Sequence, residues 1–173
     1  CEKQALAWSP REKLVSYPMP AADIPVVAAL NMPSVLAITP EFTGDKSSFL
    51  QTIEKQLNSG IRLLQLRVTS LNVQAFKELA MDVRTLCNQY DGAQLFINGD
   101  IAVARALDCA VHLKSEQLMH ADIAEQLNDH PFSAACHDLS QLKRAEKLKA
   151  QFSVLSPIQK TASHPEASGI GWK

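Results

Sequence analysis

The sequence predicts an α/β fold, a (β/α) TIM-type barrel that is truncated after its sixth strand. From residue 34 onward, short apolar segments alternate with amphipathic ones, and a repeat of roughly 20–25 residues favours a parallel sheet with right-handed crossovers. No glycine-rich dinucleotide loop follows the first apolar segment, which favours a barrel over a doubly wound sheet. A complete barrel needs eight units and roughly 200 residues or more. The six units before Lys173 therefore predict open sheet edges.

Each predicted strand is a short apolar run, and each predicted helix carries apolar residues at helical spacing. In the first helix the stripe contains Phe49, Ile53 and Leu57, and Gly60 ends it. The predicted helices span residues 45–58, 73–90, 101–107, 115–127 and 139–148. The predicted strands span residues 34–39, 61–68, 93–98, 109–113, 131–137 and 152–157.

Residues 1–33 do not join this repeat. Residues 4–8 are a candidate strand, and the proline-flanked segment 17–20 predicts a rigid turn. An apolar helix is predicted over residues 21–30, ending before Pro33. We interpret residues 1–33 as the tail of a preceding domain with a linker, and residues 34–173 as the incomplete barrel.

The composition excludes several classes of function. The 17 basic and 18 acidic residues leave a formal net charge of −1, so no global field attracts a nucleic acid polymer or an anionic membrane. No apolar run is long enough to span a bilayer. The 4 cysteines lack the spacing of zinc ligands, which predicts buried thiols in a reducing cytoplasm. We therefore expect a cytoplasmic protein with no metal site of its own.

Polar residues near the ends of the predicted strands are candidate ligand contacts, because barrels build their sites there. Gln65 and Arg67 share one face of the second strand by its two-residue period, and Arg67 could clamp a phosphate. Asn98 ends the third strand. The alternatives are a solvated arginine at a strand end and an asparagine that only forms a turn.

His137 ends the fifth strand and is the candidate general acid or base, because histidine suits proton transfer near neutral pH. The alternative is a buried structural histidine. A dyad with Cys136 is rejected, because adjacent strand residues point to opposite faces. His112 lies within a strand and is expected to be structural.

The loop after the sixth strand is the candidate phosphate site. Lys160, Thr161, Ser163 and His164 can all donate hydrogen bonds. A glycine pair, Gly169 and Gly171, would let backbone amides approach a ligand closely. The alternative is an ordinary polar loop.

Together these segments resemble the family of thiamine phosphate synthases and thiazole tautomerases. The resemblance implies a barrel that binds thiazole phosphate and, in the synthase, also a pyrimidine pyrophosphate with Mg²⁺. Residues 1–33 resemble the C-terminal end of a Nudix hydrolase domain, the type that acts on oxidised nucleotides. The motifs that carry the barrel resemblance are LAIT (36–39), LQLR (64–67), FIN (96–98), AVHL (110–113), CH (136–137), LSPIQKTASHP (155–165) and GW (171–172).

The departures from this family concern the metal. Gly99 and Gln117 stand where the resemblance implies two magnesium carboxylates, and Ala135 stands where it implies a serine. Mg²⁺ needs hard, anionic oxygen ligands. We therefore expect no cofactor, with Mg²⁺ required only by a synthase.

Three functions remain open. The first is a metal-independent tautomerase or a binder of a phosphate ligand, in which His137 is the base. The second is a non-catalytic appendage of a Nudix hydrolase, and the third is a synthase in which Asp100 replaces a lost metal ligand. The expected partners are a small phosphorylated ligand and, over the open edge, either a second copy or the Nudix domain.

Overall fold

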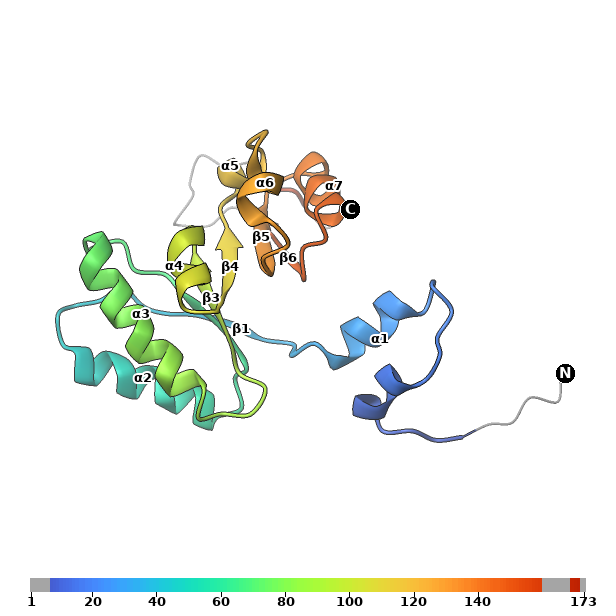
Figure 1. The fold of residues 1–173 in the computed structure, drawn as a ribbon, viewed down its shortest axis with the longest axis horizontal. Coiled ribbons are helices and arrows are strands. Elements are labelled where there is room, and N and C mark those ends of the chain that lie inside the picture. The colour runs from blue at the N-terminus through green and yellow to red at the C-terminus, as the bar shows by residue number, and fades with distance from the viewer. Residues whose placement is uncertain (1–6, 160–168, 172–173) are drawn as a thin grey trace, which may run out of the picture. The chain divides into compact units, whose positions relative to one another are not determined.

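The computed structural model describes residues 7–159 and 169–171 and divides the chain into two compact units, Cys1–Ser34 and Val35–Lys173. The second unit is a parallel sheet of six strands in the order β1-β2-β3-β4-β5-β6, curled into a half-barrel (Figure 1). This confirms the predicted barrel fold with six strands. Neighbouring strands pair in sequence order, as expected where each connection is a helical crossover. What covers the edges of β1 and β6 stays a prediction.

The strands are shorter than the sequence predicted, and each predicted range extends beyond the observed one. The parallel pairing places Gln65 of β2 beside Phe96 of β3, and Asn98 beside His112 of β4. All C-terminal strand ends therefore lie along one edge of the half-barrel. The strands are β1 Leu36–Ile38, β2 Leu63–Leu66, β3 Gln94–Asn98, β4 Ala110–Leu113, β5 Phe132–Cys136 and β6 Ser153–Leu155.

Four helices begin at side-chain caps that follow a strand. Asp45 accepts a hydrogen bond from the amide of Ser48, and Asn72, Asp100 and Asp138 cap their helices in the same way. Helices α2 and α3 pack side by side (Figure 1). None of the helices in the described part of the chain is long and apolar enough to cross a membrane. The helices of this unit are α2 Lys46–Asn58, α3 Val73–Cys87, α4 Ile101–Ala106, α5 Ser115–Leu118, α6 Ile123–Leu127 and α7 Leu139–Lys147.

The single helix predicted over residues 115–127 is wrong, because two short helices, α5 and α6, occupy this range. Leu118 and Ile123 are both buried against the core. In one continuous helix, five positions would separate these side chains by roughly 140° around the axis, so both could not face the sheet. The break between the helices lets both side chains be buried.

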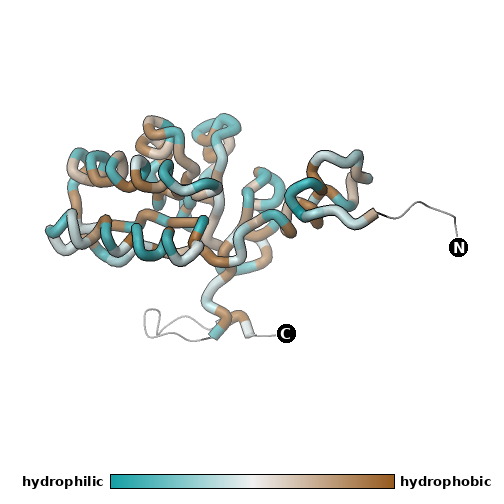
Figure 2. Tube along the Cα trace, turned by 90° about the horizontal axis from the view of Figure 1, so that it is seen from below, coloured by the Kyte–Doolittle hydropathy of each residue, from teal (hydrophilic) through white to brown (hydrophobic). Residues whose placement is uncertain are grey.

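The sheet separates an apolar layer from a more polar one. Leu64, Leu66 and Ile97 pack with the helices in the main hydrophobic core, and the hydropathy pattern alternates along the long helices (Figure 2). The alternate residues point to the opposite, inner face, where the rings of Phe96 and Phe152 lie 5.1 Å apart, edge to face. The helix side thus supplies apolar burial, and the inner side is left for polar groups.

The described cysteines are buried, as the sequence predicted, while Cys1 lies outside the described residues. Burial raises the pKa of Cys87 and of Cys109 to about 11. Burial also raises the pKa of Cys136, which packs among the core residues on the helix side. These thiols are protonated and inert at neutral pH.

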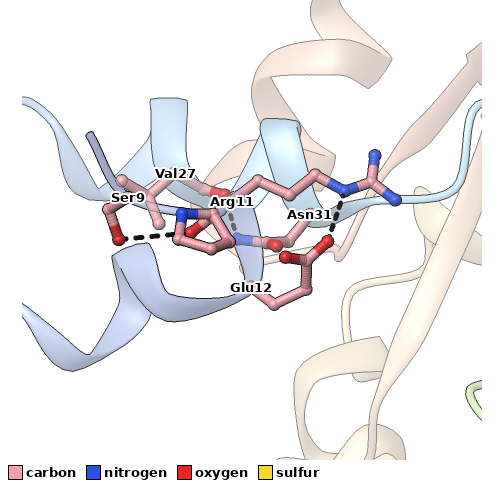
Figure 3. Close-up of polar contacts among 6 residues, drawn as sticks. Ser9, Arg11, Glu12, Val27 and Asn31 are labelled. Carbon is pink, nitrogen blue, oxygen red and sulfur yellow. Dashed lines mark hydrogen bonds and ion pairs between the residues drawn. The ribbon is translucent and has the colours of Figure 1, made fainter.

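The N-terminal unit contains a 3-10 helix, η1 (Arg11–Ser16), and one α-helix, α1 (Ile24–Asn31). The predicted helix over 21–30 is thus present with later bounds. The 3-10 helix was not predicted, because it buries no residue and so lacks an apolar stripe. Figure 3 shows its ion pair between Arg11 and Glu12, 3.1 Å apart, and the bond from Asn31 to the carbonyl of Val27. Residues 7 and 8 are not in a strand, and the rest of the predicted strand 4–8 lies outside the described residues.

Candidate functional site

The inner face carries a buried polar pair between β2 and β3. The Gln65 side chain is only 4% exposed, and its Nε2 donates to Oδ1 of Asn98 at 2.9 Å. Asn98 is the last residue of β3 and lies in register with His112 of β4. The structure therefore brings together two of the candidate residues. The Asn98 side chain bonds across the sheet instead of folding back to form a turn.

A second buried pair continues this layer across β4 and β5. Nδ1 of His112 lies 2.8 Å from Oγ of Ser133, and both side chains are buried. Burial lowers the pKa of His112 to about 4, so the ring is neutral at physiological pH. Sequence reasoning overlooked Ser133. Its two-residue offset from Ala135 and its place in a strand could have identified it as an inner-face residue.

Arg67 follows β2 and is exposed at the same edge. Its backbone amide donates to Oγ1 of Thr39 at 3.0 Å, and that hydroxyl donates to the Arg67 carbonyl at 3.3 Å. The guanidinium forms no ion pair with any residue that the structure describes. Nearby, hydrogen bonds from Ser70 and Thr69 lower the pKa of Glu41. Glu41 thereby ties the loop after β2 to the loop after β1.

His137 is exposed immediately after β5, and Cys136 before it lies in the core. The opposite placement of the two side chains agrees with the rejected dyad. Nδ1 of His137 is bonded to the carbonyl oxygen of Ser156, just beyond β6. A carbonyl only accepts hydrogen bonds, so Nδ1 carries a proton. In the neutral ring, Nε2 therefore holds the free lone pair that a general base needs.

The predicted phosphate loop lies largely outside the described residues, including Lys160, Thr161, Ser163 and His164. Its two ends are described. The amide of Ile170 donates to the Pro157 carbonyl at 3.0 Å, and that of Gly171 donates to the Ile158 carbonyl at 2.9 Å. The two ends of the loop are thus joined beside the end of β6.

The glycine pair lies where the two ends of the loop meet. A Cβ on Gly169 would lie 2.5 Å from the Ile158 carbonyl oxygen and 2.7 Å from the Cα of Gln159. Only glycine fits this approach of two backbone segments. The amide of Gly171 is already bonded within the chain. Both glycines therefore take part in the closure of the loop, and their close approach to a ligand stays a prediction.

The residues at the ends of β3 and β4 do not fit a magnesium ion. Gly99 has no side chain, and both amide atoms of Gln117 are already bonded. Its Nε2 donates to the Gly99 carbonyl at 2.7 Å, and its Oε1 accepts from the Lys114 amide at 3.1 Å. Oδ1 of Asp100 caps α4. Within residues 7–159 and 169–171, no group of three or more His, Cys, Asp or Glu side chains could hold a metal.

The sequence profile described as thiamine monophosphate synthase (TMP-TENI) matches residues 35–173. The chain belongs to this family. A candidate thiamine-phosphate synthase 2 of Aquifex aeolicus is 40% identical over 148 residues, which cover 83% of this chain and 77% of that protein. The Nudix resemblance of residues 1–33 lies outside the profile match and stays a prediction.

Two further relatives differ more in length. The thiamine biosynthesis multifunctional protein ThiED of Corynebacterium efficiens is 29% identical over 140 residues, which cover 76% of this chain and 19% of that protein. The thiamine phosphate pyrophosphorylase structure from Pyrococcus furiosus superposes with a TM-score of 0.59 at 21% identity, covering 73% of this chain and 61% of that one. This chain therefore spans less than two thirds of both proteins, and the latter likeness supports the fold alone.

We predict that His112 makes stability fall on acidification. Its pKa is lowered to about 4 in the folded chain, whereas an unfolded histidine titrates near 6.5. Between pH 6.5 and pH 4, only the unfolded state binds this proton. The free energy of unfolding therefore keeps its full value above pH 6.5 and decreases toward pH 4. The free energy of unfolding should fall by roughly 2–3 kcal/mol between pH 7.5 and 4.5 on this account. Urea titrations of the parent and of His112→Gln should show this loss only in the parent.

The matched control for this experiment is His120→Gln, because His120 is exposed. It should keep the pH dependence of the parent. An identical pH profile in the parent and in His112→Gln would contradict the prediction.

We predict that Gly99→Ala destabilises the chain more than Gly92→Ala. Both glycines have positive φ, 75° and 72°, so both alanines suffer a similar backbone strain. A Cβ on Gly99 would also lie 3.1 Å from Lys114 Cε and 3.2 Å from Gln117 Oε1, whereas Gly92 has nothing within 4 Å. The crowding should add up to about 1 kcal/mol at Gly99, because the Lys114 and Gln117 side chains must shift slightly to make room. Equal midpoints for the two variants in urea would show that neither side chain packs on Gly99.

Proposed function

We propose that the half-barrel binds a phosphorylated thiazole or a related phosphate ester at the C-terminal strand ends, with His137 as a general base of the tautomerase type. The observation that carries this proposal is the bond from Nδ1 of His137 to the Ser156 carbonyl. It orients the ring and leaves Nε2 as the basic atom at the edge where barrels hold their ligands. Membership of the thiamine monophosphate synthase family supports the class of ligand.

The proposed phosphate loop begins close to this histidine. Ser156 bonds His137, and the loop starts a few residues later and returns to pair with residues 157–158. We propose that Lys160, Thr161, Ser163 and His164 donate to the phosphate there. Gln65, Arg67 and Asn98 would contact the rest of the ligand from the neighbouring strand ends.

The proposed chemistry is a proton transfer without a redox step. Nε2 of His137 takes a proton from a carbon of the ring, and the resulting imidazolium returns it to another atom of the same ligand. No proton is consumed overall. Synthase activity is not proposed, since Gly99 and Gln117 supply no carboxylate for Mg²⁺. A non-catalytic appendage of a Nudix hydrolase is the alternative outcome of the experiments below.

We predict that thiazole phosphate raises the melting temperature of the protein. A ligand at a concentration 100-fold above its dissociation constant should add about 2.7 kcal/mol to the free energy of unfolding. The measurement is a thermal-shift titration with thiazole phosphate, thiamine phosphate and a nucleoside triphosphate as parallel ligands. Stabilisation by none of the phosphorylated thiazoles would contradict the proposal, and stabilisation by the nucleotide alone would favour the Nudix appendage.

We predict that His137→Asn abolishes exchange of the carbon-bound hydrogen of thiazole phosphate with solvent deuterium, measured by NMR. Binding in the thermal-shift titration should stay within about threefold, because only the proton transfer is lost. His120→Asn, at an exposed histidine, is the matched control and should exchange like the parent. Unchanged exchange in His137→Asn would rule out this residue as the base.

A further inference from the structure

The side chain of Lys114 lies over Gly99, at the adjoining ends of β4 and β3. The ideal Cβ position of Gly99 is 3.1 Å from Lys114 Cε and 3.7 Å from its Cδ. The backbone hydrogen bonding between β3 and β4 extends to Gly99, because the Gly99 amide donates to the His112 carbonyl at 2.9 Å. Lys114 keeps an extended backbone, with φ −68° and ψ 152°. By strand alternation it therefore lies on the same inner face as His112.

This arrangement depends on three residues together. Any side chain larger than hydrogen at position 99 would crowd the lysine stem. Gln117 bonds the carbonyl of Gly99 and the amide of Lys114, so its amide group joins the two strand ends. These are the two positions where the family resemblance implied metal carboxylates. Here Gln117 contributes a structural link between the strands, and Gly99 contributes space for a cationic side chain.

Lys114 is free to bind an anion. Its ammonium forms no ion pair with any carboxylate in the part of the chain that the structure describes, where the ion pairs are Arg11–Glu12 and Lys46–Asp82. It is exposed at the strand end. A lysine ammonium is a compact point charge with three donors, well suited to a phosphate oxygen.

The charge of the group formed by Lys114, Gly99 and Gln117 differs from that of two carboxylates that bind Mg²⁺. Two carboxylates with one Mg²⁺ sum to no net charge, and without the metal they repel a phosphate. Lys114, Gly99 and Gln117 together supply one ammonium group and no carboxylate. An anion site of this composition is ready without a metal.

We propose that Lys114 replaces the divalent cation, making the ends of β3 and β4 a metal-independent site for a phosphate or pyrophosphate group. The inference rests on the proposed binding of a phosphorylated ligand at the strand ends, and it adds a second anion contact at β3 and β4, apart from the loop after β6. The ammonium donates to the phosphate oxygens, and Gly99 leaves room for the lysine stem to reach them. No bond is made or broken in this step.

The test uses inorganic pyrophosphate as the probe and the full chain as the protein. Isothermal titration should detect pyrophosphate binding in excess EDTA, with an affinity changed less than twofold by added Mg²⁺. Lys114→Met keeps the methylene stem over Gly99 and removes the charge, so binding should weaken about tenfold or more. Lys114→Arg keeps the charge and should recover most of the affinity. Lys77→Met, at an exposed lysine of α3, is the matched control and should bind like the parent.

Each contrary outcome overturns the inference without deciding the proposed function. Pyrophosphate binding that requires Mg²⁺ would show that a metal is still used. Equal binding by Lys114→Met and Lys77→Met would exclude Lys114 as the anion contact, and so would an absence of pyrophosphate binding by the parent. The function itself is judged by thiazole phosphate alone. Circular dichroism and the melting temperature of Lys114→Met serve as the check that it folds.

Discussion

The parallel pairing of the six strands is the constraint on which the rest of the structure depends. A parallel ladder with helical crossovers sends the C-terminal end of each strand to the same edge. Residues far apart in the chain therefore meet across neighbouring strands: Gln65 with Asn98, His112 with Ser133, and His137 with the carbonyl of Ser156. The same ladder allows one face to be filled by apolar side chains against the helices. The other face is then available for paired polar groups.

Burial of polar side chains on the inner face is possible only because they are paired. An unpartnered polar group costs roughly 1–3 kcal/mol when buried, whereas a satisfied pair is slightly favourable. Gln65–Asn98 and His112–Ser133 meet this condition across neighbouring strands. The His112–Ser133 pair lowers the stability of the fold in acid. Burial disfavours protonation of His112 in the folded chain, whereas an unfolded histidine accepts the proton. The inner layer thus combines specific geometry with a dependence on pH.

At the ends of β3 and β4, two residues that differ from the family resemblance, Gly99 and Gln117, form one connected group with Lys114. Gly99, Lys114 and Gln117 contact one another through a close approach and two hydrogen bonds. A change at one position therefore affects the other two. His137 lies outside this group, after β5, and is held by its own bond to the end of β6. The proposed anion contact and the proposed base thus lie at neighbouring strand ends.

The sequence by itself determined the order of the six strands with helices between them, and the family, because hydrophobic period and motif order are local properties. It also separated Cys136 from His137 by simple alternation. Only the tertiary structure decided the break between α5 and α6, the bonding of Gln117 and the position of Lys114 over Gly99. The structure also decided which ring nitrogen of His137 is bonded to the Ser156 carbonyl and which one stays free. These features depend on strand register and on which side chains fit the same core, and both are set by residues distant in the chain.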